Sequence, residues 1–267
     1  MTSKNTLCGV IGNPIEHSLS PPIHKKFATQ LNINCDYQKY LVETEQLETF
    51  VKDFFNQGGT GLNVTLPFKQ QVLNVVAELS EASQVCQAVN TLSVDQSGKI
   101  KGDTTDGEGL LLDLKRLNFD THNKNILVVG AGGASISVIY ALLKNNAKVT
   151  LHNRSKDKIS SAISQFTKLG KIKAFELSNN NANINKFDGI ICATSQFNLS
   201  LIEPTISQLA ANAFIYDLNY AQRAEECLKY FKNKGFSRLS DGYGMLVGQA
   251  AKSFEIWHGV LPKLELD

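Results

Sequence analysis

The stretch that decides the fold of this chain lies near its middle and reads Asn125-Ile126-Leu127-Val128-Val129-Gly130-Ala131-Gly132-Gly133-Ala134-Ser135. An apolar run breaks at a glycine cluster and apolar residues at helical spacing follow, which predicts a buried strand, a tight turn and a helix start. Without a Cβ, the glycines let a pyrophosphate approach the backbone N–H groups of the helix N-terminus. The third glycine position of this fingerprint holds Ser135 instead.

The residues after the next predicted strand, 147–152, indicate which dinucleotide binds. An NAD site places an acidic residue there for the ribose hydroxyl, but this chain has Asn153-Arg154-Ser155, with Lys158 just beyond. A carboxylate would repel a 2′-phosphate, whereas a guanidinium can hold it with two hydrogen bonds. We therefore predict NADP(H) as the cofactor. The alternative is a solvated helix start with Ser155 as its N-cap.

Strand and helix patterns alternate through the second half of the chain. This alternation predicts a parallel sheet with helices on both faces. The segment 190–195 ends in small polar residues, which suits the carboxyl edge of such a sheet, where ligands bind. Ser178 to Asn185 reads as a polar loop. The strands are expected at 126–129, 147–152, 171–176, 188–193 and 213–217, and later helices at 223–234 and 245–257.

Composition describes an ordinary globular protein of 267 residues, long enough for two domains. A net charge of +2 gives no reason to expect a nucleic-acid or membrane partner. The five cysteines are scattered without a CxxC pair, which indicates buried, reduced thiols. With no signal-peptide pattern and no apolar run of membrane-spanning length, we expect a cytoplasmic protein.

The N-terminal part predicts a strand at 7–12, a helix with Ser20 as N-cap before Pro21, a helix over 46–56 and a strand at 61–66. Pro67 should start a further helix that continues to Leu79. Lys69 would then lie in the first turn, where the positive helix end and partial burial should lower its pKa, as a proton-transfer lysine needs. The alternative is a surface lysine with its stem packed on apolar neighbours.

A hairpin is expected from residues 88–94 and 99–102, with Gly98 at the turn. A helix should open near Asp106, which could be simply its N-cap, and Asp103 is another candidate for that cap. The domain boundary is expected here. In the last helix, Gln249 is a polar group on a mostly apolar stretch, which suits either a ligand contact or a hydrogen-bonded core amide.

Taken together, these motifs resemble the shikimate dehydrogenase family over essentially the whole chain. The most specific pieces, in chain order, are 13–21 (NPIEHSLSP), 63–69 (NVTLPFK), 88–91 (AVNT), 102–107 (GDTTDG), 130–135, 153–155 and 242–250 (GYGMLVGQA). The resemblance implies an α/β fold of two domains: a discontinuous N-terminal α/β substrate domain, residues 1–105 plus 242–267, and a Rossmann-type doubly wound NADP-binding domain, residues 106–241.

The resemblance further implies NADPH-dependent, reversible reduction of 3-dehydroshikimate to shikimate in aromatic amino-acid biosynthesis, by a monomer or homodimer. Lys69 and Asp106 would form the catalytic pair. The substrate's carboxylate and hydroxyls would be held, beside that pair, by Ser18, Ser20, Thr65, Asn90, Tyr220 and Gln249. The cofactor would contact Gly130, Ala131, Gly132, Gly133, Ala134, Asn153, Arg154, Ser155, Lys158, Thr194, Leu218 and Gly242.

The chain departs from the family pattern at several places. Thr104 replaces an asparagine beside the expected catalytic acid, and Lys158 occupies a position often held by a second arginine. The other departures are Cys192, Gln196-Phe197 and Leu218-Asn219. They lead to the hypothesis that NADPH binds more weakly than is typical. Two other functions stay open: an NAD-using quinate/shikimate enzyme, which Asn153-Arg154 argues against, and a cofactor-binding regulator without turnover, which Lys69 and Asp106 argue against.

Overall fold

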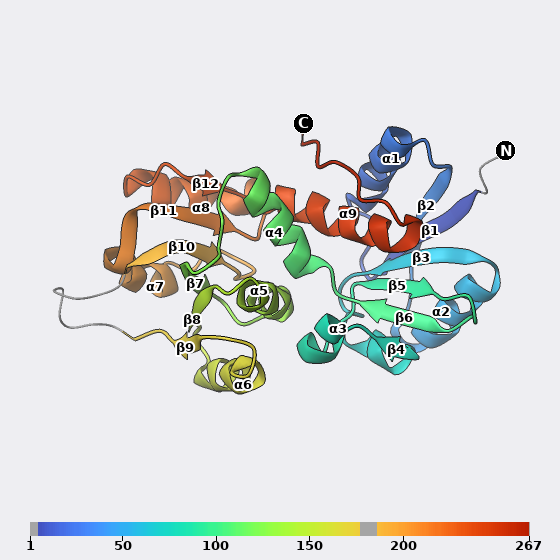
Figure 1. The fold of residues 1–267 in the computed structure, drawn as a ribbon, viewed down its shortest axis with the longest axis horizontal. Helices are drawn as coiled ribbons and strands as arrows, with labels where there is room; N and C mark the ends of the chain where they lie inside the picture. The colour runs from blue at the N-terminus through green and yellow to red at the C-terminus, as the bar shows by residue number, and fades with distance from the viewer. Residues whose placement is uncertain (1–4, 177–185, 267) are drawn as a thin grey trace. The chain divides into compact units, whose positions relative to one another are not determined.

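The computed structural model describes residues 5–176 and 186–266, so the predicted polar loop at 178–185 lies outside the described residues. The chain forms two compact units, Met1–Gly109 with Val247–Asp267, and Leu110–Leu246 (Figure 1). Two helices cross the division along the chain: α4 (Asp106–Arg116) and α9 (Tyr243–His258). Each unit is built on its own six-stranded sheet.

The first unit has a mixed sheet in the order β2-β1-β3-β5-β6-β4. The strands β2, β1 and β3 are parallel, whereas β5 runs antiparallel to both β3 and β6. The strands are β1 (Thr6–Gly12), β2 (Cys35–Leu41), β3 (Gly59–Val64), β4 (Glu78–Leu79), β5 (Thr91–Val94) and β6 (Ile100–Asp103). The helices, besides the end of α9, are α1 (Ser20–Leu31), α2 (Leu47–Asn56) and α3 (Glu81–Cys86), with 3₁₀ turns η1 (Thr44–Gln46) and η2 (Gln71–Asn74).

The alternation of side chains along β1 separates two cores in this unit. Ile11 packs with Val51 and Phe54 of α2 on one face of the sheet. Cys8 and Val10 point to the other face, where Trp257 of α9 packs against them. The central strand is therefore apolar on both faces, as a strand covered on both sides must be.

The second unit has a fully parallel sheet in the order β12-β11-β10-β7-β8-β9, the doubly wound Rossmann order, which confirms the predicted fold class (Figure 1). Residues 126–129 lie on the central strand β7 with 0% exposure each, which explains the continuous apolar run. The strands are β7 (Asn125–Val129), β8 (Lys148–His152), β9 (Ile172–Ala174), β10 (Phe187–Cys192), β11 (Leu209–Asp217) and β12 (Leu239–Ser240). The helices are α5 (Gly133–Lys144), α6 (Lys156–Phe166), α7 (Leu199–Ile202) and α8 (Gln222–Asn233), with the 3₁₀ segment η3 (Glu203–Gln208).

The helix predicted from Pro67 to Leu79 is wrong. A turn, the short η2 and the strand β4 occupy this range instead. In an α-helix the carbonyl of Lys69 would accept from the N–H of Leu73, but here it accepts from the N–H of Val89 at 2.8 Å. Lys69 is thus held on a turn by a neighbouring segment and does not lie in the first turn of a helix.

Two predicted N-caps are also wrong. Ser20 is the first residue of α1 rather than its cap, and Leu19 precedes the helix without a side-chain cap; the Ser20 N–H donates to Ser18 Oγ at 3.3 Å. Asp103 ends β6 and accepts from the Ser80 hydroxyl at 2.8 Å, so it does not cap α4. The predicted hairpin is confirmed as β5 and β6, with Gly98 at φ 81° in the turn.

His24 of α1 is enclosed by aromatic rings in the first unit. Its imidazole stacks on Tyr37 at a centroid distance of 4.1 Å and on Trp257 at 5.3 Å. The residue is 0% exposed, and neither ring nitrogen has a hydrogen-bond partner among the described residues. Burial, together with the nearby His258, lowers the pKa of His24 to about 3. A neutral imidazole is therefore built into this core.

We predict that His24 destabilises the first unit in acid. The unfolded chain binds a proton at His24 near pH 6.5, whereas the folded chain does so only near pH 3. The free energy of unfolding should therefore be highest above pH 6.5 and fall below it, with His24 accounting for about 2 kcal/mol at pH 5. Urea unfolding followed by Trp257 fluorescence, at several pH values, measures this; His24→Phe should flatten that part of the profile. Equal pH profiles in both proteins would contradict the assignment.

Candidate functional site

Four connections of the first unit meet at one edge of its sheet. The parallel strands β1 and β3 are in register at Ile11 and Val64 and end together. The antiparallel strand β5 begins at this edge and β6 ends there, since Thr91 pairs with both Asn63 and Asp103. The segments 13–20, 65–70, 88–90 and 104–106 therefore converge. The carboxyl ends of parallel strands are where α/β sheets bind ligands.

An ion pair between Lys69 and Asp106 lies at this edge. Lys69 Nζ is 2.6 Å from Asp106 Oδ2, and the side chains are 25% and 10% exposed. Asp106 is the first residue of α4, where the positive helix end favours a negative charge. The structure thus brings together the two residues that were predicted as a catalytic pair, a lysine ammonium and a carboxylate.

Asn90 holds the other oxygen of that carboxylate. Its Nδ2 donates to Asp106 Oδ1 at 2.8 Å, and its Oδ1 accepts from the backbone N–H of Thr105 at 2.9 Å. The Asn90 backbone is fixed as well, because its N–H donates to the carbonyl of Asp103 at 2.9 Å. Asp106 therefore has a hydrogen-bond or ion-pair partner on each oxygen and is oriented before any ligand arrives.

A buried polar network supports Asn90 from behind. Ser253 Oγ lies 2.8 Å from Thr91 Oγ1 and accepts from Asn63 Nδ2 at 2.9 Å. Tyr37 donates in turn to Asn63 Oδ1 at 2.7 Å. Sequence reasoning assigned no role to these residues; the one available signal was the spacing of four that places Ser253 on the same face of α9 as Gln249.

The remaining predicted substrate residues of this unit lie on the same edge. Gln249 Oε1 is 3.4 Å from Asn90 Nδ2, which places the amide of α9 beside the ion pair. Thr65 follows β3, and a Cβ added at Gly12 would lie 2.6 Å from Thr65 Cγ2, so the loop to Ser18 and Ser20 starts against it. Ser18 is half-buried and Ser20 buried. Their contact with a ligand remains a prediction.

The glycines in the turn before α5 of the second unit differ in what surrounds them: one is packed against backbone, and two border open space. Gly130 has φ 116°, and a Cβ there would lie 2.7 Å from the carbonyl oxygen of Ala193. At Gly132, the N-cap of α5, and at Gly133 an added Cβ would meet nothing within 4 Å. Open space at a helix N-terminus fits a pyrophosphate, and Ala131 and Ala134 flank it with small side chains.

Ser135 also has a structural explanation. Its hydroxyl donates to the carbonyl of Gly132 at 2.7 Å, so a serine at the third fingerprint position closes the first turn of α5 rather than filling the ligand space.

Arg154 follows the carboxyl end of β8 and is exposed to solvent. Ser155 caps α6, accepting from the N–H of Lys158 at 3.4 Å, so the predicted cap is confirmed. Asn153 Nδ2 donates to the carbonyl of Ser155 at 3.2 Å. The described residues offer the Arg154 guanidinium no hydrogen bond or ion pair, which leaves its donors available to a phosphate.

The other predicted cofactor residues lie where β10, β11 and β12 end. Leu218 donates its N–H to the carbonyl of Cys192 at 2.8 Å, and Thr194 Oγ1 donates to the carbonyl of Gln196 at 2.7 Å. A Cβ at Gly242 would lie 2.2 Å from the carbonyl oxygen of Leu218, so backbone packing requires this glycine. Tyr220 packs edge-on against Tyr243 in the same unit.

Two of the departures from the family pattern concern packing. Cys192 is 2% exposed and belongs to the core beneath β10 and β11, and Phe197 packs against the same cluster. These side chains support the strand ends from the core side. Whether they weaken cofactor binding stays a prediction.

Models of known protein families match nearly the whole chain. Residues 10–92 match the model of the shikimate dehydrogenase substrate binding domain, residues 113–237 that of shikimate / quinate 5-dehydrogenase, and residues 242–266 that of the shikimate 5′-dehydrogenase C-terminal domain. The chain is 41% identical over 258 residues to a shikimate dehydrogenase (NADP(+)) of Shewanella woodyi, covering 96% of this chain and 93% of that protein. It is 42% identical over 259 residues to one of Colwellia psychrerythraea, covering 96% and 92%.

A solved structure is similar as well. Shikimate 5-dehydrogenase of Thermus thermophilus, crystallised with NADP(H) and shikimate, has a TM-score of 0.83 at 27% identity, covering 97% of this chain and 95% of that one.

We predict that the network behind Asn90 stabilises the first unit. Thr91→Val keeps the shape of the side chain but leaves the partners of its hydroxyl unsatisfied, which should cost about 1–3 kcal/mol. Urea unfolding followed by Trp257 fluorescence measures the loss. Thr60→Val on the neighbouring strand β3 is the control, because the described residues give the Thr60 hydroxyl no partner. Equal effects of the two substitutions would show that the network adds no stability.

Proposed function

We propose roles for individual residues from one premise: this chain belongs to the shikimate dehydrogenase family. It catalyses the reversible, NADPH-dependent reduction of 3-dehydroshikimate to shikimate, in the pathway to the aromatic amino acids. The observation that carries the residue assignment is the Lys69–Asp106 pair, 2.6 Å apart and partly buried at the sheet edge where α/β folds bind ligands.

Lys69 is the proton-transfer residue of this proposal. The reduced cofactor, when bound, supplies the hydride. As the substrate's carbonyl carbon is reduced, its oxygen gains negative charge, and an ammonium beside it both stabilises that charge and donates a proton. In the opposite direction, Lys69 Nζ accepts the proton of the hydroxyl. Asp106 orients the ammonium, and Asn90 keeps the carboxylate in place.

The substrate presents one carboxylate and several hydroxyls, which suit serine, threonine and amide partners. In the first unit the proposed partners are Ser18, Ser20, Thr65, Asn90 and Gln249. The proximity of the Asn90 and Gln249 amides to the ion pair supports this set. Tyr220 is proposed as a further substrate contact from the second unit.

The dinucleotide is assigned to the second unit. Gly132 and Gly133 leave open space for the pyrophosphate at the N-terminus of α5. Arg154, with Lys158 close by in the sequence, is proposed to hold the 2′-phosphate. The proposed domains, 1–105 plus 242–267 and 106–241, differ by a few residues from the division into compact units, which falls after Gly109 and after Leu246.

The proposal also covers the location and the oligomeric state of the enzyme. In the described part of the chain, none of the helices combines the length and apolar character needed to cross a bilayer. We propose a cytoplasmic enzyme that acts as a monomer or homodimer.

The direct test of the proposed reaction is NADPH formation from shikimate and NADP⁺, followed by absorbance and repeated with quinate and with NAD⁺. Signal with shikimate and NADP⁺ is expected, and silence with every pair in a folded protein that binds NADPH would favour a regulator.

We predict that Lys69→Ala lowers kcat by about 10²–10⁴-fold, because the group that accepts the hydroxyl proton during shikimate oxidation is lost, while substrate binding is partly retained. Steady-state kinetics with shikimate and NADP⁺ measure kcat and KM separately. Lys101→Ala is the matched control, since this surface lysine of β6 pairs with Glu78 away from the site. A raised KM with unchanged kcat would instead assign Lys69 a role in binding alone.

We predict that Arg154→Gln weakens NADP⁺ selectively. Losing a charge-assisted contact to the 2′-phosphate should lower kcat/KM for NADP⁺ by about 10–100-fold and leave NAD⁺ nearly unaffected. Lys148→Gln, at the opposite end of β8, is the control for a general change of surface charge. If kcat/KM falls equally for NADP⁺ and NAD⁺, Arg154 does not bind the 2′-phosphate.

A further inference from the structure

Two thiols and an imidazole lie together in the first unit, on residues that the reaction does not use. Cys8 Sγ, Cys35 Sγ and a ring nitrogen of His258 all lie within 4.8 Å of one another. Cys8 is buried, Cys35 and His258 are half-buried, and both cysteines are free thiols. His258 Nε2 is buried and has no hydrogen-bond partner among the described residues.

The strand register explains why the two cysteines meet. Thr6 of β1 pairs with Cys35 of β2, and Cys8 pairs with Tyr37. Because side chains alternate along a strand, Cys8 and Cys35 point to the same face of the sheet. That face is the one against which Trp257, at the end of α9, packs.

The end of α9 is fixed firmly over this face. Trp257 Nε1 donates to the carbonyl of Leu92 at 2.9 Å. Gly61 of β3 lies directly against the indole, since a Cβ there would be 2.2 Å from the ring. The His258 ring also packs on Phe254, at 4.2 Å between centroids. The imidazole is therefore positioned by the packing of the end of α9 on this core.

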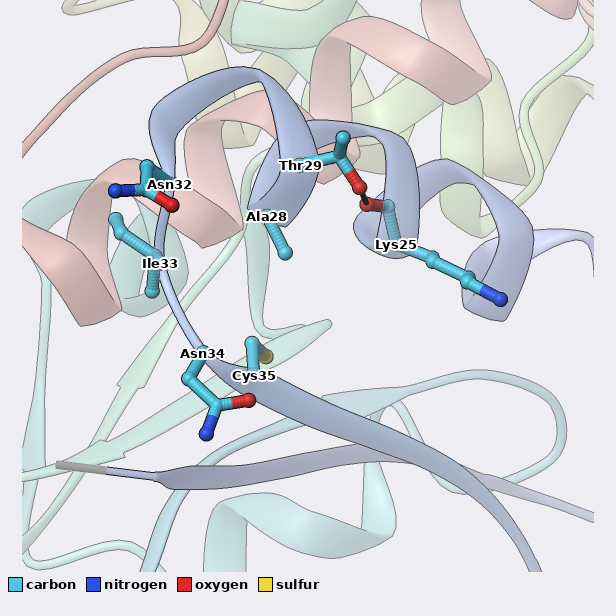
Figure 2. Close-up of a pocket in the computed structure, with 7 residues that line it drawn as sticks. All are labelled: Lys25, Ala28, Thr29, Asn32, Ile33, Asn34 and Cys35. Carbon is cyan, nitrogen blue, oxygen red and sulfur yellow. Dashed lines mark hydrogen bonds between the residues drawn. The ribbon is translucent and has the colours of Figure 1, made fainter. Parts of the chain in front are cut away.

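A surface pocket of about 420 Å³ leads to Cys35. Figure 2 shows it between α1 and the start of β2, with the Cys35 side chain below Ala28 and the Lys25 ammonium directed away from the sulfur. The pocket gives a small ion a route to Cys35, one of the three residues of the cluster. It also leaves room for a water molecule as an additional ligand. The pocket is lined by Lys25, Ala28, Thr29, Asn32, Ile33, Asn34 and Cys35.

We propose that Cys8, Cys35 and His258 form a binding site for a soft or borderline divalent cation of the zinc class. Thiolate and imidazole are the donors that zinc prefers, and hard ions such as Mg²⁺ prefer oxygen. Donor atoms within 4.8 Å of one another need only a small contraction to surround one ion. On binding, the two thiols lose their protons to solvent, and a water molecule from the pocket completes a tetrahedral set.

The bound ion would join the first two strands to the last helix. This connection stabilises the folded first unit, because the ion binds the assembled site far better than the unfolded chain. The proposal is independent of the dehydrogenase reaction, since none of the three residues is assigned to the substrate or the cofactor.

Cobalt(II) and zinc(II) are the probes for this site. Reduced, chelator-treated protein titrated with Co²⁺ should develop thiolate-to-cobalt charge-transfer absorption and visible d–d bands, both removed by Zn²⁺. Saturating Zn²⁺ should raise Tm by roughly 5 °C or more. Cys35→Ser should halve or abolish the charge-transfer band. Either Cys35→Ser or His258→Gln should weaken zinc binding by at least about 10–100-fold, the loss that the removal of an outer-shell partner alone causes.

The control is Cys227→Ser. Cys227 lies beside Cys192 in the second unit, a thiol pair outside the cluster. This variant should bind cobalt and zinc like the parent chain. The proposal is overturned if the parent protein shows no thiolate charge-transfer band, if Cys35→Ser and His258→Gln bind as the parent does, or if mass spectrometry finds Cys8 and Cys35 joined as a disulfide under reductant. If Cys35→Ser does not fold, His258→Gln decides the outcome alone.

Discussion

The hydrogen bond from the Asn90 amide to the Asp106 carboxylate is the interaction on which the first unit's site depends. One oxygen of Asp106 is bound to Asn90 and the other faces Lys69. A partly buried carboxylate with only one partner would have several orientations and would hold the ammonium loosely. With both oxygens engaged, the position of Lys69 Nζ follows from that of Asp106, and the position of Asp106 follows from that of Asn90.

Asn90 is in turn fixed by the sheet. Its N–H donates to the carbonyl of Asp103 and its carbonyl accepts from the N–H of Val64, so it continues the hydrogen bonding of two strand ends. Ser253 and Thr91 add a contact from α9 to the same edge. The site is therefore an extension of the sheet, and its geometry is set by elements from both ends of the chain.

How much could be predicted from the sequence differs between the two units. The doubly wound sheet followed from its strands, because β7 is buried on both faces and reads as a continuous apolar run. The helix expected after Pro67 failed because Lys69 bonds to Val89, a contact between distant segments that periodicity does not reveal. The strand β2 and the two-residue strand β4 were not predicted for a related reason, since pairing with neighbouring strands defines them more than their own sequence patterns do.

The candidate site shows the same limit. Lys69 and Asp106 are 37 residues apart, and motifs predicted the pair without giving its geometry. Ser253 could be inferred only from its helical spacing to Gln249. Asn63 reaches Ser253, and Tyr37 reaches Asn63, only through tertiary packing. Buried polar side chains need partners, so a network of this kind is built by the fold as a whole.

Glycine explains how α9 can bring Gln249 so near to that network. A Cβ at Gly109 of α4 would lie 2.3 Å from the backbone nitrogen of Gln249, and one at Gly248 would lie 2.4 Å from the carbonyl oxygen of Gly109. The two helices therefore touch backbone to backbone at this point, which only glycine permits. Since α4 starts at Asp106 and α9 carries Gln249, their contact sets the separation of the carboxylate from the amide. The chain has thus used two residues without side chains to position two whose side chains are proposed to bind substrate.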